Sequence, residues 1–102
     1  MAQFDLHKDR KGRLYPLLLD VQADLLSHLD TRTVVPLAPK PRFGAKPLRR
    51  LNPVISFGGV EYVLVFQEMA AISIAELGDV QGTLASHRTE LIAAIDFLFT
   101  GS

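Results

Sequence analysis

The stretch Ser86–Ser102 is the sequence feature that most constrains the fold. Ser86 is suited to cap the N-terminus of a helix, and Gly101 can end one in a left-handed conformation. Between them, apolar residues recur at intervals of one, three and four, which places them on one stripe of an α-helix. These residues are Leu91, Ile92, Ile95, Leu98 and Phe99. The fold must therefore provide an apolar surface against which one amphipathic helix can pack.

One aromatic residue of this helix falls outside the stripe. At about 100° per residue, Phe97 lies opposite the stripe, beside Ala93 and near Asp96 and Thr100. We therefore expect the Phe97 ring to point away from the domain's own core, toward a partner.

The remainder of the chain contains short segments with the patterns of β-strands. Leu17, Leu18 and Leu19 are consecutive, so both faces of their sheet must be covered, in one interpretation by a second subunit. Gly58-Gly59 predicts a two-residue hairpin turn. Pro16 and Pro36 lack an N–H group and are expected at sheet edges. The predicted strands span residues 3–7, 14–21, 33–38, 52–57, 60–66 and 71–77, the last ending at Gly78.

The connections between these strands differ in character. Residues 8–13 read as a hairpin loop and residues 22–32 as a turn of helix or a structured loop. Residues 79–85 lead into the terminal helix. This order predicts a mainly β (α+β) protein, a small antiparallel barrel or sandwich with a helix packed across it. A length of 102 residues corresponds to one domain, residues 1–102, with one modest core.

Composition excludes several classes of function. The chain has no cysteine, which excludes disulfides and thiolate chemistry, and its formal net charge is zero, so no global field attracts nucleic acid or lipid. No apolar run approaches the roughly 20 residues of a membrane span, so we interpret the 48% hydrophobic content as a subunit interface. The N-terminal residues lack a signal-peptide pattern, and we expect a cytoplasmic protein without membrane contact.

No catalytic, cofactor or metal motif is recognisable. His7, His28 and His87 lie far apart without metal-ligand spacing, and phosphate-binding and dinucleotide-binding glycine motifs are absent. Asp20 and Asp24 could act as acid and base, but the favoured interpretation is that each faces solvent or caps a turn. We therefore expect no cofactor and no metal.

Two cationic features have open interpretations. Pro39–Arg50 contains five basic residues, three prolines and no acid, which predicts a loop, either solvated or a basic contact patch. His87 and Arg88 occupy the first helical turn, where the helix dipole disfavours positive charge. Arg88 either fixes the helix entry by bonding loop carbonyls or a carboxylate such as Glu90 or Asp79, or contacts a partner.

Short matches along the whole chain resemble the CcdB family of toxins from bacterial toxin–antitoxin pairs. The matching residues are Gln3-Phe4, Asp20-Val21-Gln22 with Asp24, Val35-Pro36-Leu37-Ala38, Leu51, Pro53-Val54, Met69-Ala70, Leu77-Gly78, Ser86-His87-Arg88, Ala94-Ile95, Phe99 and Gly101. The resemblance implies a homodimer with a partly open SH3-like antiparallel barrel, a small additional sheet and one C-terminal helix from each subunit beside the twofold axis.

The same resemblance implies a function without chemistry. Such toxins bind the DNA gyrase A subunit and trap its cleaved DNA complex. A CcdA-type antitoxin neutralises them, and operator DNA is contacted only through the antitoxin complex. The gyrase-binding residues that the resemblance implies are Gln3, Phe4, Ala23, Leu25, Leu26, Asp96, Phe99, Thr100, Gly101 and Ser102.

The tail differs from that family. Its well-known members end in Trp-Gly-Ile, and the tryptophan stacks on an arginine of gyrase, a cation–π contact of roughly 0.5 to 2 kcal/mol. This chain has Thr100-Gly101-Ser102, so we expect weak or absent poisoning, or poisoning of a different gyrase through Phe97 and Phe99. Asp96 replaces an amide, Ala23 a serine and His7 a tyrosine.

Two other functions stay open. The barrel also resembles the MazF and Kid ribonucleases, in which case Arg10, Arg13 and the basic segment 40–50 would contact RNA phosphates. A non-toxic relative would keep the fold and antitoxin binding without harming the cell.

Overall fold

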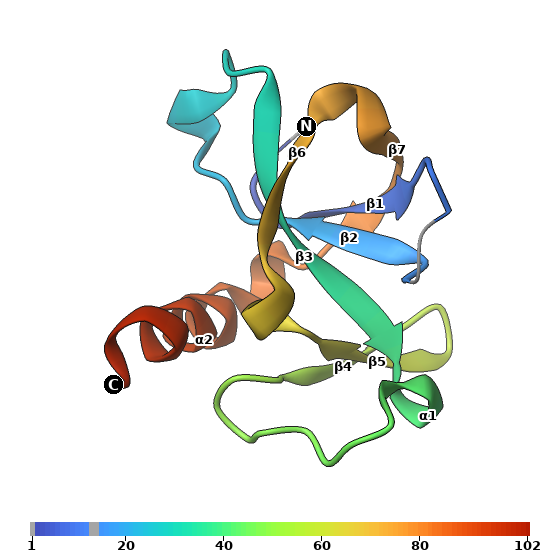
Figure 1. Ribbon diagram of the computed structural model, residues 1–102, viewed down its shortest axis with the longest axis vertical. Helices are drawn as coiled ribbons and strands as arrows, with labels where there is room; N and C mark the ends of the chain where they lie inside the picture. Colours follow the sequence, from blue (N-terminus) through green and yellow to red (C-terminus); the bar gives the residue numbers. More distant parts are fainter. Residues whose placement is uncertain (1, 13–14) are drawn as a thin grey trace.

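The computed structural model describes residues 2–12 and 15–102, so Arg13 and the start of the second predicted strand at Leu14 lie outside the described residues. Within them, seven strands form one curled antiparallel sheet with the order β4-β5-β3-β2-β1-β7, and β6 pairs with β3 off this path (Figure 1). The strands are β1 (Asp5–Asp9), β2 (Leu17–Asp20), β3 (Thr31–Pro39), β4 (Val54–Phe57), β5 (Val60–Leu64), β6 (Ala70–Ser73) and β7 (Leu77–Thr83).

The helices are α1 (Lys40–Phe43), which is a single turn, and the C-terminal α2 (Arg88–Thr100). In the described residues, three short 3₁₀-helices connect strands, and a fourth leads from β7 into α2. They are η1 (Asp24–Leu26), η2 (Phe66–Glu68), η3 (Ile74–Glu76) and η4 (Ala85–His87). A curled half-barrel with one C-terminal helix and the small extra strand β6 confirms the predicted mainly β, SH3-like fold.

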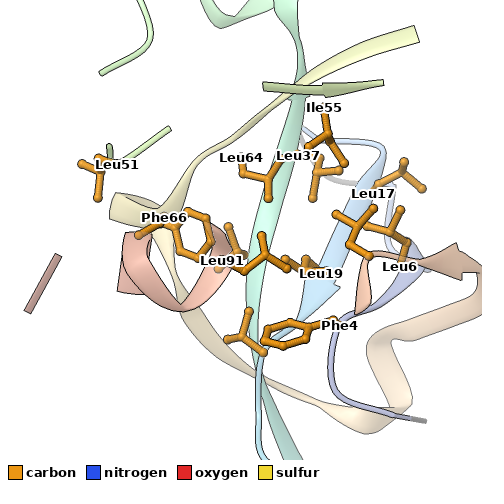
Figure 2. Packing of buried hydrophobic residues seen from close by; sticks show 14 residues of the cluster. Phe4, Leu6, Leu17, Leu19, Leu37, Leu51, Ile55, Leu64, Phe66 and Leu91 are labelled. Atoms are coloured by element: carbon orange, nitrogen blue, oxygen red, sulfur yellow. The ribbon is translucent and has the colours of Figure 1, made fainter. Parts of the chain in front are cut away.

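The core lies inside the curl of the sheet. Alternate side chains of neighbouring strands face it because successive strand residues point to opposite faces. Leu91 of α2 packs into this cluster between Phe66 and Leu19 (Figure 2). The other strand residues of the cluster are Leu6, Leu17, Val35, Leu37, Ile55 and Leu64.

The two end strands of the sheet order meet through a side chain. A Cβ atom placed on Gly82 of β7 would lie 2.6 Å from Cε1 of the Phe57 ring of β4. A side chain at position 82 would displace this ring, so glycine lets the ring rest against the β7 backbone. Among the described residues, β4 and β7 meet at this seam by side-chain packing and are not joined by a ladder of hydrogen bonds, so the barrel stays partly open.

All three consecutive leucines of β2 are buried, which confirms that both faces of this strand are covered. Leu17 and Leu19 belong to the main core, while Leu18 joins a second cluster with Val34 and Leu77. The chain itself supplies both covers.

The prediction that Pro36 marks an edge is wrong. β3 is a shared strand: residues Thr31 to Val34 pair with β6, and Leu37 to Pro39 pair with β5. Pro36 lies between the part of β3 that pairs with β6 and the part that pairs with β5, so its missing N–H interrupts neither ladder. The Pro36 carbonyl accepts a hydrogen bond from Val65 N at 2.9 Å.

Two predicted boundaries are also wrong. Residues 71–77 do not form one strand ending at Gly78, because the Ser73 hydroxyl accepts from Ala75 N at 3.2 Å and starts η3. β7 instead runs through Gly78, where a Cβ would lie 2.8 Å from the Lys8 carbonyl oxygen. In the basic segment, α1 replaces part of the predicted loop and ends at Gly44 in the left-handed conformation.

The predicted C-terminal helix is present, but the prediction that Ser86 caps its N-terminus is wrong. It begins at Arg88, and His87 occupies the N-cap without a side-chain cap bond, because Ser86 is part of η4. Gly101 at φ 75° confirms the predicted C-terminal end. The outward orientation predicted for Phe97 is wrong as well: it packs partly against the core, while Phe99 points outward. The buried face of α2 centres on Leu91 and Ala94. Compared with the predicted apolar stripe, this face is rotated about the helix axis toward Phe97 and away from Phe99.

Candidate functional site

The residues implied in partner binding gather in two clusters. The loop cluster comprises Gln3, Phe4, Ala23, Leu25 and Leu26, and the helix-end cluster comprises Asp96, Phe99, Thr100, Gly101 and Ser102. In Figure 1 the β2–β3 loop and the end of α2 lie at the same side of the view, the loop above and the helix end below.

The β2–β3 loop presents apolar side chains to solvent. Leu25 is 90% exposed, and Leu26 and Leu29 are also exposed. Gln22 holds the loop from below: its Nε2 donates to Leu26 O at 3.3 Å and to Thr31 O at 3.1 Å. The loop's shape is therefore fixed without its leucines, which remain available for a contact. Leu29 was absent from the implied set, although its helical spacing with Leu25 and Leu26 was a usable signal.

A buried ion pair supports the base of this loop. Both oxygens of the Asp20 carboxylate are used: Oδ2 lies 2.6 Å from Arg32 Nη2 and 2.9 Å from Nε, while Oδ1 accepts from Gln22 N at 3.0 Å. Neither side chain is exposed. Asp20 thus caps a turn, as predicted, but the alternative that it faces solvent is wrong. Sequence spacing gave no signal that Arg32 would neutralise it.

Asp24 has a separate role from Asp20. Its Oδ1 accepts from the backbone N of Gln3 at 2.8 Å, on the exposed side of the loop. The two carboxylates are therefore engaged in different structural contacts, one buried and one exposed.

Gln3 ties the loop to the start of α2. Its Nε2 donates to Val21 O at 3.2 Å, and its Oε1 accepts from Arg88 Nη1 at 3.1 Å. Arg88 therefore fixes the helix entry, as one interpretation predicted, but through an amide rather than Glu90 or Asp79. The Arg88 guanidinium also lies 5.7 Å from the centre of the Phe4 ring. Its unfavourable position in the first helical turn was the signal that singled out Arg88 in the sequence, although the resemblance did not include it among the gyrase-binding residues.

Phe4 supports the site from inside. Its ring is 1% exposed in the core, and its backbone adopts φ 70°, which turns the chain between Gln3 and β1. Its backbone N donates to Asp20 O at 2.6 Å, and its O accepts from Leu84 N at 2.7 Å. Within the loop cluster, surface for a partner is therefore offered by Gln3, Ala23, Leu25 and Leu26.

The helix end presents one aromatic ring. Phe99 is 71% exposed. Thr100 Oγ1 donates to Asp96 O at 2.7 Å and accepts from Ser102 N at 3.3 Å, so the polar tip bonds mainly to itself. Phe97 is covered instead, with the Arg50 guanidinium 4.5 Å from its ring centre.

The basic segment is partly anchored to the domain. Arg50 packs on Phe97, and Lys40 Nζ lies 3.7 Å from Glu61 Oε1. Arg42, Lys46 and Arg49 are exposed. A contact between this segment and a partner stays a prediction.

The chemistry offered by the two clusters is that of protein recognition: exposed leucines, one ring and short polar side chains. In residues 2–12 and 15–102, no group of three His, Asp or Glu side chains is arranged to hold a metal ion. Across that same part of the chain, no helix has the length and apolar character needed to cross a membrane. His7 is buried, with its Nδ1 3.0 Å from Gly78 O.

Comparison with known proteins agrees with the fold. A family model described as "CcdB protein" matches residues 3–101. The structure is also similar to that of an endoribonuclease from a mycobacterial species, solved in complex with its cognate antitoxin. The TM-score is 0.75 at 13% sequence identity, over 96% of this chain and 93% of that chain.

Proposed function

This chain belongs to the CcdB family, and from that membership we propose that it is the toxin of a type II toxin–antitoxin pair, binding the DNA gyrase A subunit as a homodimer. A CcdA-type antitoxin would neutralise it, with operator DNA contacted only through the complex of the two. The observation that carries this proposal is the family match over nearly the whole chain. The expected location is the cytoplasm.

The surface chemistry supports binding to a protein. An interface needs a few apolar anchors surrounded by polar groups that exclude water. Phe99 and Leu25 are the most exposed large apolar side chains in the described residues, and each belongs to one of the two clusters. A homodimer would present each anchor twice, which strengthens binding when both copies can reach the target.

Replacement of Phe99 tests the proposed surface. We expect Phe99→Ala to weaken binding to immobilised gyrase A subunit by about tenfold or more, because loss of a central anchor costs roughly 2 kcal/mol. Surface plasmon resonance measures the affinity, and a gyrase DNA-cleavage assay measures poisoning. Val80→Ala is the matched control, since Val80 is also exposed but lies on β7 outside both clusters.

The alternatives are separate outcomes of the same assays. The first alternative is a ribonuclease, and the fold shared with an endoribonuclease is the reason to test it. Single-stranded RNA is therefore incubated with the parent protein in parallel. Cleaved RNA without gyrase binding would replace the proposal by a ribonuclease. Antitoxin binding without either activity would identify a non-toxic relative.

A further inference from the structure

The basic segment, Pro39–Arg50, carries positive charge that the rest of the protein only partly neutralises. Between Asp30 and Glu61, the sequence contains six lysine or arginine residues and no acidic residue. Three of the six are engaged within the protein: Arg32, Lys40 and Arg50. The other three are exposed, and in the described part of the chain none of them forms an ion pair with a carboxylate. These three exposed cations are Arg42, Lys46 and Arg49.

The fold holds the backbone of the basic segment in a defined shape. Near its start, α1 ends at Gly44, where a φ of 76° turns the chain. Just beyond its end, the buried Asn52 side chain accepts a hydrogen bond from Leu48 N at 3.1 Å and donates one to Leu64 O at 3.0 Å. Because the backbone is ordered before a partner arrives, less conformational entropy is lost on binding.

The basic segment lies beside the helix-end cluster. Its last residue, Arg50, has its guanidinium 4.5 Å from the centre of the Phe97 ring on α2. Phe99 of the helix-end cluster follows two positions further along the same helix. In Figure 1 the chain between α1 and β4 runs along the bottom of the view, below α2 and β4. A target that binds the end of α2 would therefore bring whatever it carries close to the exposed cations.

Three unpaired cations on one segment suit a chain of phosphates. Double-stranded DNA carries one negative charge per about 1.7 Å of its axis, and lysine and arginine neutralise its phosphates with release of counterions. The planar head of an arginine also binds a phosphate through two hydrogen bonds. Contacts to phosphates need no apolar surface. Within the basic segment, all of which the structure describes, Leu48 is the one large apolar side chain that is exposed.

Two other partners fit the basic segment less well. Recognition of single-stranded RNA uses aromatic rings on which unpaired bases stack, and the one aromatic residue of the segment, Phe43, is half-buried. Interfaces between proteins are usually poor in lysine and depend on a few buried apolar anchors. The composition of the segment therefore favours a DNA duplex.

We propose that the basic segment binds the phosphate backbone of duplex DNA through Arg42, Lys46 and Arg49, and that it does so on DNA held by gyrase. The second part rests on the proposed function: with the helix-end cluster on the A subunit, the segment beside it would face the DNA that the enzyme holds. Contacts to the backbone do not read bases, so they would strengthen binding at any DNA sequence.

The first test measures binding of the full chain to a labelled DNA duplex of about 20 base pairs by fluorescence anisotropy. At about 50 mM salt we expect a Kd on the order of 10⁻⁵ M, which is weak because the formal net charge of the chain is zero. Raising the salt to about 200 mM should weaken binding roughly 40-fold, the change expected for three phosphate contacts. A duplex of a different sequence should bind equally well.

Replacing the three exposed cations by neutral residues tests their role. We expect Arg42→Gln combined with Lys46→Gln and Arg49→Gln to weaken duplex binding by about tenfold or more. This triple variant should also lose most of the salt dependence, because each lost phosphate contact reduces the salt slope by about one. All three side chains are exposed, so the fold is not at risk.

The matched control removes the same charge from another part of the surface. Lys8, Arg10 and Lys11 are exposed and lie in β1 or directly after it. Their joint replacement by glutamine should preserve most of the duplex affinity and of its salt dependence. Equal losses in the two triple variants would overturn the proposal, since binding would then follow total charge alone.

Competition with other polyanions identifies the class of partner. The duplex should bind more tightly than a single-stranded RNA of about 20 nucleotides, because its phosphates are more densely spaced. It should also bind more tightly than an oligoglutamate peptide. Tighter binding of the RNA or of the peptide would overturn the proposal in favour of RNA or an acidic protein, and so would a parent chain that fails to bind the duplex.

The second test adds the immobilised gyrase A subunit, with and without a bound duplex. The triple variant of the basic segment should bind the A subunit alone as the parent does, but about tenfold more weakly than the parent when DNA is present. Equal affinities of parent and variant in the presence of DNA would overturn the second part of the proposal. A parent that binds the duplex but not the A subunit would contradict the proposed function, while the contact with free duplex would stand.

Discussion

Arg32→Met is expected to lower the free energy of unfolding by about 3 to 5 kcal/mol, the cost of leaving a buried carboxylate without its partner. Water cannot replace the guanidinium beside the Asp20 carboxylate, since the side chains of Asp20 and Arg32 are both 0% exposed. Asp20 would keep the Gln22 N–H donor but lose both contacts from the guanidinium. Urea unfolding measures the change, and the protein concentration is kept fixed because the stability of the proposed homodimer would depend on it.

The matched control is the double variant Asp20→Leu with Arg32→Met. Replacing both members of a buried pair by apolar residues of similar size is often close to neutral, so most of the lost stability should return. If Arg32→Met alone is largely unfolded, recovery in the double variant still reports the coupling. A loss below about 1 kcal/mol in the single variant would mean that water reaches the carboxylate, contrary to its burial.

Thr100→Trp combined with Ser102→Ile is expected to increase gyrase poisoning by about tenfold or more. A tryptophan provides the π face that Thr100 lacks, and each cation–π contact contributes roughly 0.5 to 2 kcal/mol, doubled in a homodimer. The hydrogen bonds lost are those of an exposed tip, Thr100 Oγ1 to Asp96 O and Ser102 N to Thr100 Oγ1. Their loss should change stability by less than about 0.5 kcal/mol.

A second double variant distinguishes the effect of the added tryptophan ring from the effect of losing the hydrogen bonds of the Thr100 and Ser102 hydroxyls. Thr100→Val with Ser102→Ala removes the same hydroxyls without adding a ring, and it should poison gyrase no better than the parent. DNA-cleavage and supercoiling assays measure both variants. Equal activity of the ring-bearing variant and this control would reject the explanation based on the tip.

Local sequence patterns predicted helices, strands and turns better than they predicted which residues pack against one another. The Gly58-Gly59 hairpin was predictable because both turn residues need positive φ, which they have at 58° and 78°. The terminal helix was predictable from its period and Gly101. Which face of this helix is buried was not predictable, because Phe97 is covered by Arg50. Arg50 belongs to the basic segment, and the periodicity of the helix contains no information about that segment.

The interior of the site was the least predictable part. Resemblance placed residues such as Phe4 in contact with a partner, yet the fold uses its ring as core. A sequence does not show that Asp20 and Arg32 meet, because β2 and β3 must first pair in one register.

The link between Gln3 and Arg88 joins residues 85 positions apart, and β7, near the end of the chain, pairs with β1 at its start. Contacts this distant in sequence form only after most of the chain is available. During synthesis, the recognition surface therefore stays unassembled until β7 and Arg88 have left the ribosome. Synthesis itself delays the protein's first encounter with any target until these two segments can fold.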